Sequence, residues 1–156
     1  MPREFSESCR MRPIRSGDAE AVAILSRAAR FDAIPNFPNL HTPAEDFAFY
    51  TQEIARSSGY VAEDSSGSIE GFVIWREDFI YHLYVDIAHQ RNGIGSELLE
   101  KAIESMNAST VKLWTFQANV KAVSFYKKKG FIISDATDGE NDEKLPDFPF
   151  TFTRWT

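Results

Sequence analysis

The segment from Phe79 to Met106 places a glycine-containing turn between a strand pattern and a helix pattern. The run Phe79–Val85 is rich in aromatic and branched apolar residues, which is typical of a strand. From Gly93 onward, apolar residues recur at helical spacing, at Ile94, Leu98, Leu99, Ala102, Ile103 and Met106. A turn that opens a helix exposes backbone N–H groups and the positive end of the helix dipole, and glycine lets a ligand approach that backbone closely. The sequence therefore predicts a site for a phosphate-bearing ligand at this junction.

Two common phosphate-binding motifs do not fit this turn. A Walker A loop requires a lysine directly after its second glycine, and Ser96 follows Gly95 here. A dinucleotide fingerprint requires a third glycine, where this chain has Leu98, and an early position in the fold, whereas this turn lies past the middle of the chain. The turn therefore matches neither motif, and its predicted phosphate site belongs to another class.

A second strand–helix segment follows between residues 113 and 131. Leu113–Phe116 has the composition of a strand, and Asn119 is a favourable N-cap for the helix after it. Apolar residues continue at helical offsets, lysines crowd the last turn, and Gly130 ends the helix at the C′ position. The residues that carry this pattern are Ala122, Phe125, Tyr126, Lys127, Lys128 and Lys129.

Together the two segments resemble the two signatures of the GCN5-related N-acetyltransferase (GNAT) superfamily. Gln90, Gly93 and Gly95 match Gln/Arg-x-x-Gly-x-Gly/Ala behind Leu83-Tyr84-Val85-Asp86, and Asn119 to Phe131 matches Asn-x-x-Ala-x-x-Phe-Tyr-x-x-x-Gly-Phe. The resemblance implies that acetyl-CoA is bound as a co-substrate, with its pyrophosphate on the turn and its pantetheine arm along the preceding strand, and that no metal is used. The cofactor-binding residues it implies are Leu83, Val85, Gln90, Arg91, Asn92, Gly93, Ile94, Gly95, Ser96, Asn119 and Tyr126.

The remaining patterns extend this order of elements over nearly the whole chain. Strands are expected at 11–14, 59–63, 69–75, 79–85, 113–116, 131–134 and 150–155. A first helix should follow Asp18, with Val22, Ile24, Leu25, Ala28 and Ala29 on its apolar face, and a second should follow the capping box Thr42-Pro43-Ala44-Glu45. We therefore predict an α/β fold, a mixed sheet with helices on both faces. The resemblance implies that the sheet has about seven mostly antiparallel strands and a V-shaped split between the fourth and fifth.

Length and composition limit the number of domains and the kinds of partner that we expect. A chain of 156 residues suffices for one domain, which we expect from residue 10 to 156 after a loose leader over residues 1–9. The single cysteine, Cys9, cannot form an internal disulfide, which suits the cytoplasm. No apolar run approaches ~18 residues, so we expect no membrane span. A net charge of −6 argues against nucleic-acid binding. The sequence leaves a homodimer open.

Acetyl transfer to an amine requires a base and an acid, because an alkyl amine with a pKa near ~10.4 is almost fully protonated at pH 7. The resemblance assigns the general acid to Tyr126; the alternative is that Tyr126 only packs in the core beside Phe125. The strand before the turn lacks a glutamate, and His82 is its one titratable group with an ordinary pKa near neutrality. His82 is thus a candidate catalytic base. Alternatively, His82 is a half-buried strand residue hydrogen-bonded to a neighbouring loop. Glu77 and Asp78, at the preceding turn, are alternative bases that would act through water.

The expected activity is direct transfer of an acetyl group from acetyl-CoA to a primary amine, of a small molecule, within a ternary complex. Two alternatives are a protein N-terminal or lysine acetyltransferase and a non-catalytic acyl-CoA sensor. The acidic stretch Asp138–Glu143 lacks the spacing of an EF-hand. It is either a solvated loop or a segment that attracts a cationic acceptor.

Overall fold

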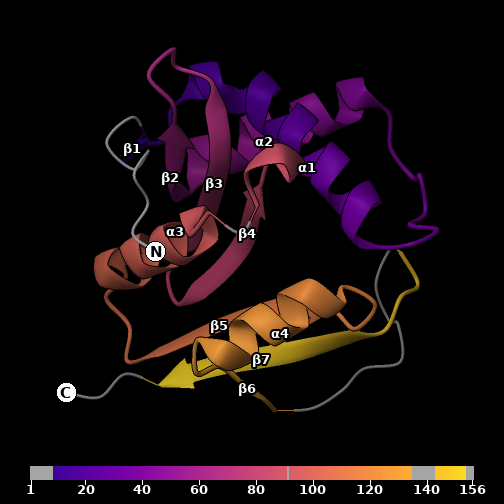
Figure 1. Ribbon diagram of the computed structural model, residues 1–156, viewed down its shortest axis with the longest axis vertical. Coiled ribbons are helices and arrows are strands. Elements are labelled where there is room, and N and C mark those ends of the chain that lie inside the picture. The colour runs from indigo at the N-terminus through magenta and orange to yellow at the C-terminus, as the bar shows by residue number, and fades with distance from the viewer. Residues whose placement is uncertain (1–8, 91, 135–142, 154–156) are drawn as a thin grey trace.

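The computed structural model describes residues 9–90, 92–134 and 143–153, which contain four α-helices and seven strands (Figure 1). The strands are β1 (Arg10–Pro13), β2 (Ser58–Glu63), β3 (Ile69–Arg76), β4 (Phe79–Val85), β5 (Thr110–Phe116), β6 (Ile132–Ile133) and β7 (Asp147–Thr153). The helices are α1 (Ala19–Ala33), α2 (Pro43–Arg56), α3 (Ile94–Ser105) and α4 (Val120–Lys128), with short 3₁₀ turns η2 (Ser16–Asp18) and η3 (Ile87–His89). The predicted order of helices and strands is confirmed. Residues 1–8 of the predicted leader over residues 1–9, and residues 138–142 of the acidic stretch, lie outside the described residues.

The strands form one sheet in the order β1-β2-β3-β4-β5-β7-β6, and every neighbouring pair except β4–β5 is antiparallel. Strands β4 and β5 run parallel and pair only at Phe79 with Lys112 and at Ile80 with Leu113. Beyond Leu113, β5 continues to pair with β7 alone. The expected mixed sheet with a split between the fourth and fifth strands is confirmed.

The last strand starts at Asp147, earlier than the predicted start at residue 150. Pro149 lies within it and pairs with Trp114 of β5. Proline cannot donate a ladder hydrogen bond, so a strand pattern is discounted around it. Here the Pro149 carbonyl accepts from the Ser134 N–H, so this position contributes to the sheet through its acceptor.

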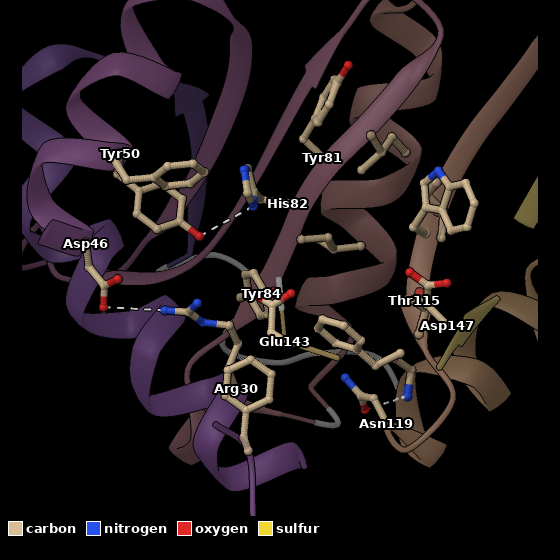
Figure 2. Close-up of a pocket in the computed structure, with 18 of the residues that line it drawn as sticks. Arg30, Asp46, Tyr50, Tyr81, His82, Tyr84, Thr115, Asn119, Glu143 and Asp147 are labelled. Carbon is tan, nitrogen blue, oxygen red and sulfur yellow. Dashed lines mark hydrogen bonds and ion pairs between the residues drawn. The ribbon is translucent and has the colours of Figure 1, made fainter. Parts of the chain in front are cut away.

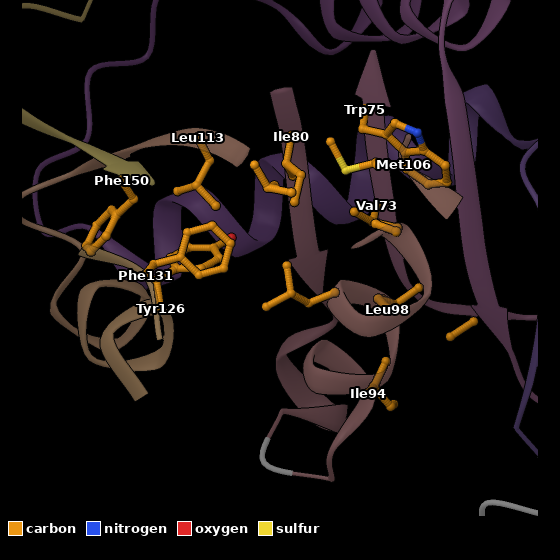
Figure 3. Packing of buried hydrophobic residues seen from close by; sticks show 14 residues of the cluster. Val73, Trp75, Ile80, Ile94, Leu98, Met106, Leu113, Tyr126, Phe131 and Phe150 are labelled. Carbon is orange, nitrogen blue, oxygen red and sulfur yellow. The ribbon is translucent and has the colours of Figure 1, made fainter. Parts of the chain in front are cut away.

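Two buried clusters lie on opposite faces of the sheet, because side chains alternate along each strand. On β3, Phe72 and Ile74 pack against α1 and α2. Val73 and Trp75 pack on the other face with α3, and that cluster continues across Ile80 and Leu113 to α4 and β7 (Figure 3). Its further members include Ile94, Leu98, Met106, Tyr126, Phe131 and Phe150. The core thus joins the two halves of the sheet at the only place where β4 and β5 still pair.

The predicted apolar face of α1 is wrong in part. Ile24 is 62% exposed and Ala28 is exposed, whereas Ala23 and Ser26 are buried. Ser26 faces inward because its hydroxyl lies 2.6 Å from that of Tyr50 on α2, which satisfies both buried groups. The Ser26–Tyr50 contact thus places a polar residue on the buried face of α1, which therefore differs from the predicted apolar face.

Candidate active site

The glycine turn between β4 and α3 has the geometry of an anion site. Gly93 has φ 82° and ψ 1°, a left-handed conformation that favours glycine, and it is the N-cap residue of α3. Within the described chain, no side chain caps this helix, so its first N–H groups are available to an external acceptor. The expected strand–turn–helix junction is therefore formed.

The segment leading into the turn is held in place by polar contacts. The Gln90 side chain donates to the Val85 carbonyl at 3.2 Å. The His89 ring lies between two carboxylates, 3.0 Å from Asp86 and 2.9 Å from Glu70. The Asp86 N–H also donates to the Glu70 carbonyl at 2.8 Å. These contacts fix the end of β4 relative to the start of α3.

A cavity of about 780 Å³, here called the turn cavity, lies beside this turn. Many of the predicted cofactor-binding residues line it: Leu83, Val85, Gln90, Gly93, Gly95, Ser96, Asn119 and Tyr126. Ile94 does not, because its side chain is in the core at 1% exposure, which leaves only its backbone for a ligand. Asn92 is absent from the lining, and Arg91 lies outside the described residues.

A second cavity of about 420 Å³, here called the fork cavity, lies where β4 and β5 diverge (Figure 2). Its walls come from α1, the loop after it, α2, β4, β5, α4 and the segment before β7. The two cavities share lining residues, namely Leu83, Tyr84, Asn119, Ala122 and Tyr126. A ligand in one cavity can therefore meet a ligand in the other at the split in the sheet.

Tyr126 packs in the core and also lines both cavities. Its side chain is 7% exposed, and its ring packs against Phe131 and Phe150 at 5.5 and 5.8 Å between centroids. Tyr126 also lines both cavities, and its hydroxyl has no hydrogen-bond partner within the described part of the chain. Burial raises the pKa of Tyr126, so the hydroxyl stays protonated and can donate. A buried hydroxyl without a protein partner is suited to a bound ligand.

Asn119 begins α4 as predicted. Its side-chain oxygen accepts from the Ala122 N–H at 3.2 Å. Asn119 also lines both cavities, which leaves its amide group near any ligand there.

His82 is bound by helix α2 and not by a loop. Its Nε2 lies 2.8 Å from Glu53 Oε1. Its Nδ1 lies 3.4 Å from the Tyr50 hydroxyl, a contact that Figure 2 shows. His82 lines the fork cavity together with Tyr50, whereas Glu53 does not. Burial lowers the pKa of His82, and it prevails over the hydrogen bond and charge of Glu53, which act in the opposite direction. His82 is therefore neutral at pH 7 and able to accept a proton.

Glu53 is the buried carboxylate that the sequence analysis missed. Its side chain is 2% exposed and contacts Arg56 and Arg76 as well as His82. Burial opposes its charge, but the hydrogen bonds from His82 and Arg56 outweigh burial and lower the pKa of Glu53 to about 2. The available signal was its spacing: Glu53 follows Tyr50 by three positions and precedes Ile54, so it shares their buried helix face.

The other predicted acids are placed away from the cavities. Asp78 pairs with Lys112 at 3.4 Å on the surface, and Glu77 lies in the β3–β4 turn with φ 53°. Neither residue lines the turn cavity or the fork cavity. Of the acidic stretch, the described residue Glu143 lines the fork cavity, as does Asp147.

Arg30 and Asp46 also line the fork cavity without having been predicted. Asp46 accepts from Arg27 at 2.9 Å and from Arg30 at 3.5 Å, which ties α1 to α2.

Across the described residues, no group of three His, Cys, Asp or Glu side chains could hold a metal ion, and no helix has the length and hydropathy needed to cross a bilayer.

Comparisons with known proteins agree with this geometry. Residues 55–133 match the model of the acetyltransferase (GNAT) domain family. A probable N-acetyltransferase of Mycobacterium tuberculosis is 35% identical over 97 residues, which cover 56% of this chain and 55% of that protein. The chain spans about half the length of the curated relatives that it matches.

Solved structures share the fold over nearly the whole chain. A GCN5-related N-acetyltransferase from Rhodopseudomonas palustris superposes with a TM-score of 0.78 at 18% identity, covering 94% of this chain and 96% of that one. The PaiA N-acetyltransferase of Thermoplasma acidophilum, solved in complex with coenzyme A, has a TM-score of 0.71 at 17% identity, covering 94% and 99%. At these identities the likeness establishes the fold.

Proposed function

The chain belongs to the GNAT acetyltransferase family, and on that premise we propose that it transfers an acetyl group from acetyl-CoA to the primary amine of a small molecule. The observation that carries this proposal is the meeting of two cavities at Tyr126, in the split between β4 and β5. One cavity adjoins the helix N-terminus that suits a pyrophosphate, and the other offers room for an acceptor. A shared wall favours direct transfer in a ternary complex.

The turn cavity is the proposed site of acetyl-CoA. The backbone N–H groups from Arg91 to Ser96 would hold the pyrophosphate, and the β4 backbone at Leu83 and Val85 would bind the pantetheine arm and polarise the thioester carbonyl. Gly93 supports this assignment through its left-handed backbone, and the coenzyme A bound to the Thermoplasma structure supports the choice of ligand.

In the reaction, the neutral amine nitrogen attacks the thioester carbonyl carbon. A C–N bond forms, the C–S bond breaks, and the nitrogen releases a proton to a base. We assign Tyr126 as the acid that protonates the departing thiolate, because its hydroxyl is protonated, buried and without a partner among the described groups. Its position on the wall of both cavities suits a donor that acts at the point of transfer.

We assign His82 as the base, with Glu53 as the residue that positions it. In this assignment Glu53 accepts the Nε2 hydrogen at 2.8 Å, which leaves the Nδ1 lone pair, 3.4 Å from the Tyr50 hydroxyl, to accept a proton. A carboxylate that holds one imidazole nitrogen fixes the tautomer and stabilises the imidazolium that forms when the other accepts a proton. The depressed pKa of His82 keeps this lone pair available at neutral pH.

The size of the fork cavity supports a small acceptor over a folded protein surface. The lone Cys9 supports a cytoplasmic location, and the net charge of −6 supports a partner other than nucleic acid.

The test is a steady-state assay that follows free coenzyme A thiol and identifies the acetylated amine by mass spectrometry. With both substrates varied, direct transfer predicts intersecting double-reciprocal lines, whereas a covalent acetyl-enzyme predicts parallel lines. Tight binding of acetyl-CoA with no acetylated product from any amine would contradict the enzyme and favour the acyl-CoA sensor.

A further inference from the structure

The mouth of the fork cavity is surrounded by exposed aromatic side chains. Tyr81 and Trp114 directly follow the last β4–β5 pair, at the point where the strands diverge, and they are 43% and 50% exposed. Phe49 of α2 is 47% exposed, and its ring meets the His82 ring edge-on at 5.6 Å. Aromatic rings are usually buried for the large apolar area they remove from water. Exposed rings on three elements around one opening therefore indicate a surface that binds an apolar group.

One of these rings is held in position by a charge. The Arg76 guanidinium lies 3.7 Å from the centroid of the Tyr81 ring, and Arg76 is itself bound to Glu53 and Ser57. A cation–π contact of this kind fixes the plane of the ring before a ligand arrives.

Further aromatic side chains line the same cavity. Phe37, on the loop between α1 and α2, meets Phe116 of β5 edge-on at 5.7 Å, and Tyr84 of β4 lines the cavity as well. A cavity of about 420 Å³ falls within the range of small-molecule sites. The space is therefore suited to a compact, flat apolar body.

The polar groups of the cavity favour a cation. Glu143, before β7, and Asp147, the first residue of β7, both line it, and Arg30, which also lines it, pairs with Asp46 at 3.5 Å. An independent sign of a ligand is the Tyr126 hydroxyl, which belongs to a 7% exposed side chain and has no hydrogen-bond partner among the described residues.

We propose that the acceptor is a small cationic amine attached to a flat aromatic body and lacking a carboxylate. The ring would lie between Tyr81, Trp114 and Phe37, and the ammonium group would be attracted by Glu143 and Asp147 toward Tyr126. A polyamine would leave the aromatic walls without an apolar partner. An amino acid would bring its own carboxylate against those of the cavity. This inference rests on the proposed acetyl transfer.

The first experiment compares matched amines in the thiol-release assay, with the product confirmed by mass spectrometry. We expect kcat/KM for 2-phenylethylamine to exceed that for putrescine, which lacks the ring, by about tenfold or more. It should exceed that for phenylalanine, which adds only the carboxylate, by a similar factor.

Substitutions of residues at the mouth of the fork cavity test the same contacts. Trp114→Ala and Tyr81→Ala should each raise KM for 2-phenylethylamine about fivefold while the Kd of acetyl-CoA is unchanged. Glu143→Gln should reduce the preference for 2-phenylethylamine over phenylalanine. Ile132→Ala removes a 70% exposed apolar side chain from β6, outside both cavities, and should leave all constants unchanged.

The possible outcomes distinguish a failure of the aromatic-acceptor proposal from a failure of the proposed acetyl transfer. Faster acetylation of putrescine, of spermidine or of a peptide N-terminus would overturn the aromatic acceptor and leave the acetyltransferase intact. An unchanged KM in both Trp114→Ala and Tyr81→Ala would do the same. Acetylation of no amine at all would overturn the proposed function and this inference with it.

Discussion

The Tyr126 side chain packs in the core through its ring and lines both cavities, and its hydroxyl is the acid that we propose. Tyrosine can do this because its apolar body and its polar tip are separate. His82 is a second example: its ring is half-buried against α2 and lines the fork cavity, with Nε2 near Glu53 and Nδ1 3.4 Å from the Tyr50 hydroxyl. The chemistry assigned to each residue therefore depends on which atom faces the ligand.

Tyr126→Phe removes only the hydroxyl, so the ring packing should persist. We expect kcat to fall ~10²-fold, the usual loss for a general acid, while the Kd of acetyl-CoA stays within about threefold. Stopped-flow and calorimetry measure the two constants. Tyr60→Phe is the control, since Tyr60 lines neither cavity. A kcat within about twofold of the parent, with chemistry rate-limiting, would make Tyr126 a packing residue only.

Glu53→Gln tests the pairing of Glu53 with His82. The Glu53 charge raises the pKa of His82 against the effect of burial, so its removal should lower that pKa further. We expect the low-pH limb of kcat/KM to move to lower pH and the plateau to fall about tenfold, because the imidazole becomes a weaker base. Arg56→Gln removes the 61% exposed partner of Glu53 and should change neither. A loss of thermal stability with an unmoved pH limb would show that Glu53 only holds α2 to the sheet.

At the scale of elements, the site depends on the divergence of β4 from β5 and on the turn that follows β4. The fork cavity lies where the two strands diverge, and the turn presents the N-terminus of α3 to the adjoining turn cavity. Helix α4 then closes this space with Asn119 and Tyr126. The arrangement has a left-handed residue at Gly93, so we expect substitution there to disturb the turn.

Gly93→Ala should weaken acetyl-CoA binding about tenfold or more, roughly 1.4 kcal/mol, by straining the turn that presents the N–H groups. Gly67→Ala is a matched control, because Gly67 has φ 88° in the β2–β3 hairpin and no neighbour within 4 Å of an added Cβ. Both variants should lose similar stability, but only Gly93→Ala should lose affinity by calorimetry. Equal affinities in the two folded variants would remove the turn from the cofactor site.

Features that depend on neighbours in the sequence were predictable. Thr42 and Glu45 form the expected capping box, with contacts of 3.1 and 2.8 Å, and Gly130 ends α4 with φ 93°. The pairing of Glu53 with His82 joins residues 29 positions apart, so no local pattern could reveal it. The buried face of α1 was misjudged because Ser26 is buried through Tyr50, on another helix.

At the scale of the whole molecule, the described strands form one sheet from β1 to β7 with a core on each face, and the single domain over residues 10–156 stays a prediction. The cofactor signatures lie in the second half of the chain, whereas α1, α2 and the loop between them supply much of the fork cavity. The sequence therefore indicated the cofactor more fully than the acceptor. The net charge of −6 would also favour the approach of a cationic acceptor, an effect that salt should weaken.

The most direct test is a crystal structure of the protein with coenzyme A bound. We expect the pyrophosphate against the backbone N–H groups of the turn that contains Gly93. We expect the sulfur atom at the wall shared by the two cavities, beside Leu83, Tyr84 and Tyr126. A pyrophosphate bound away from this turn, or a sulfur atom outside the split between β4 and β5, would contradict the proposed acetyl-CoA site.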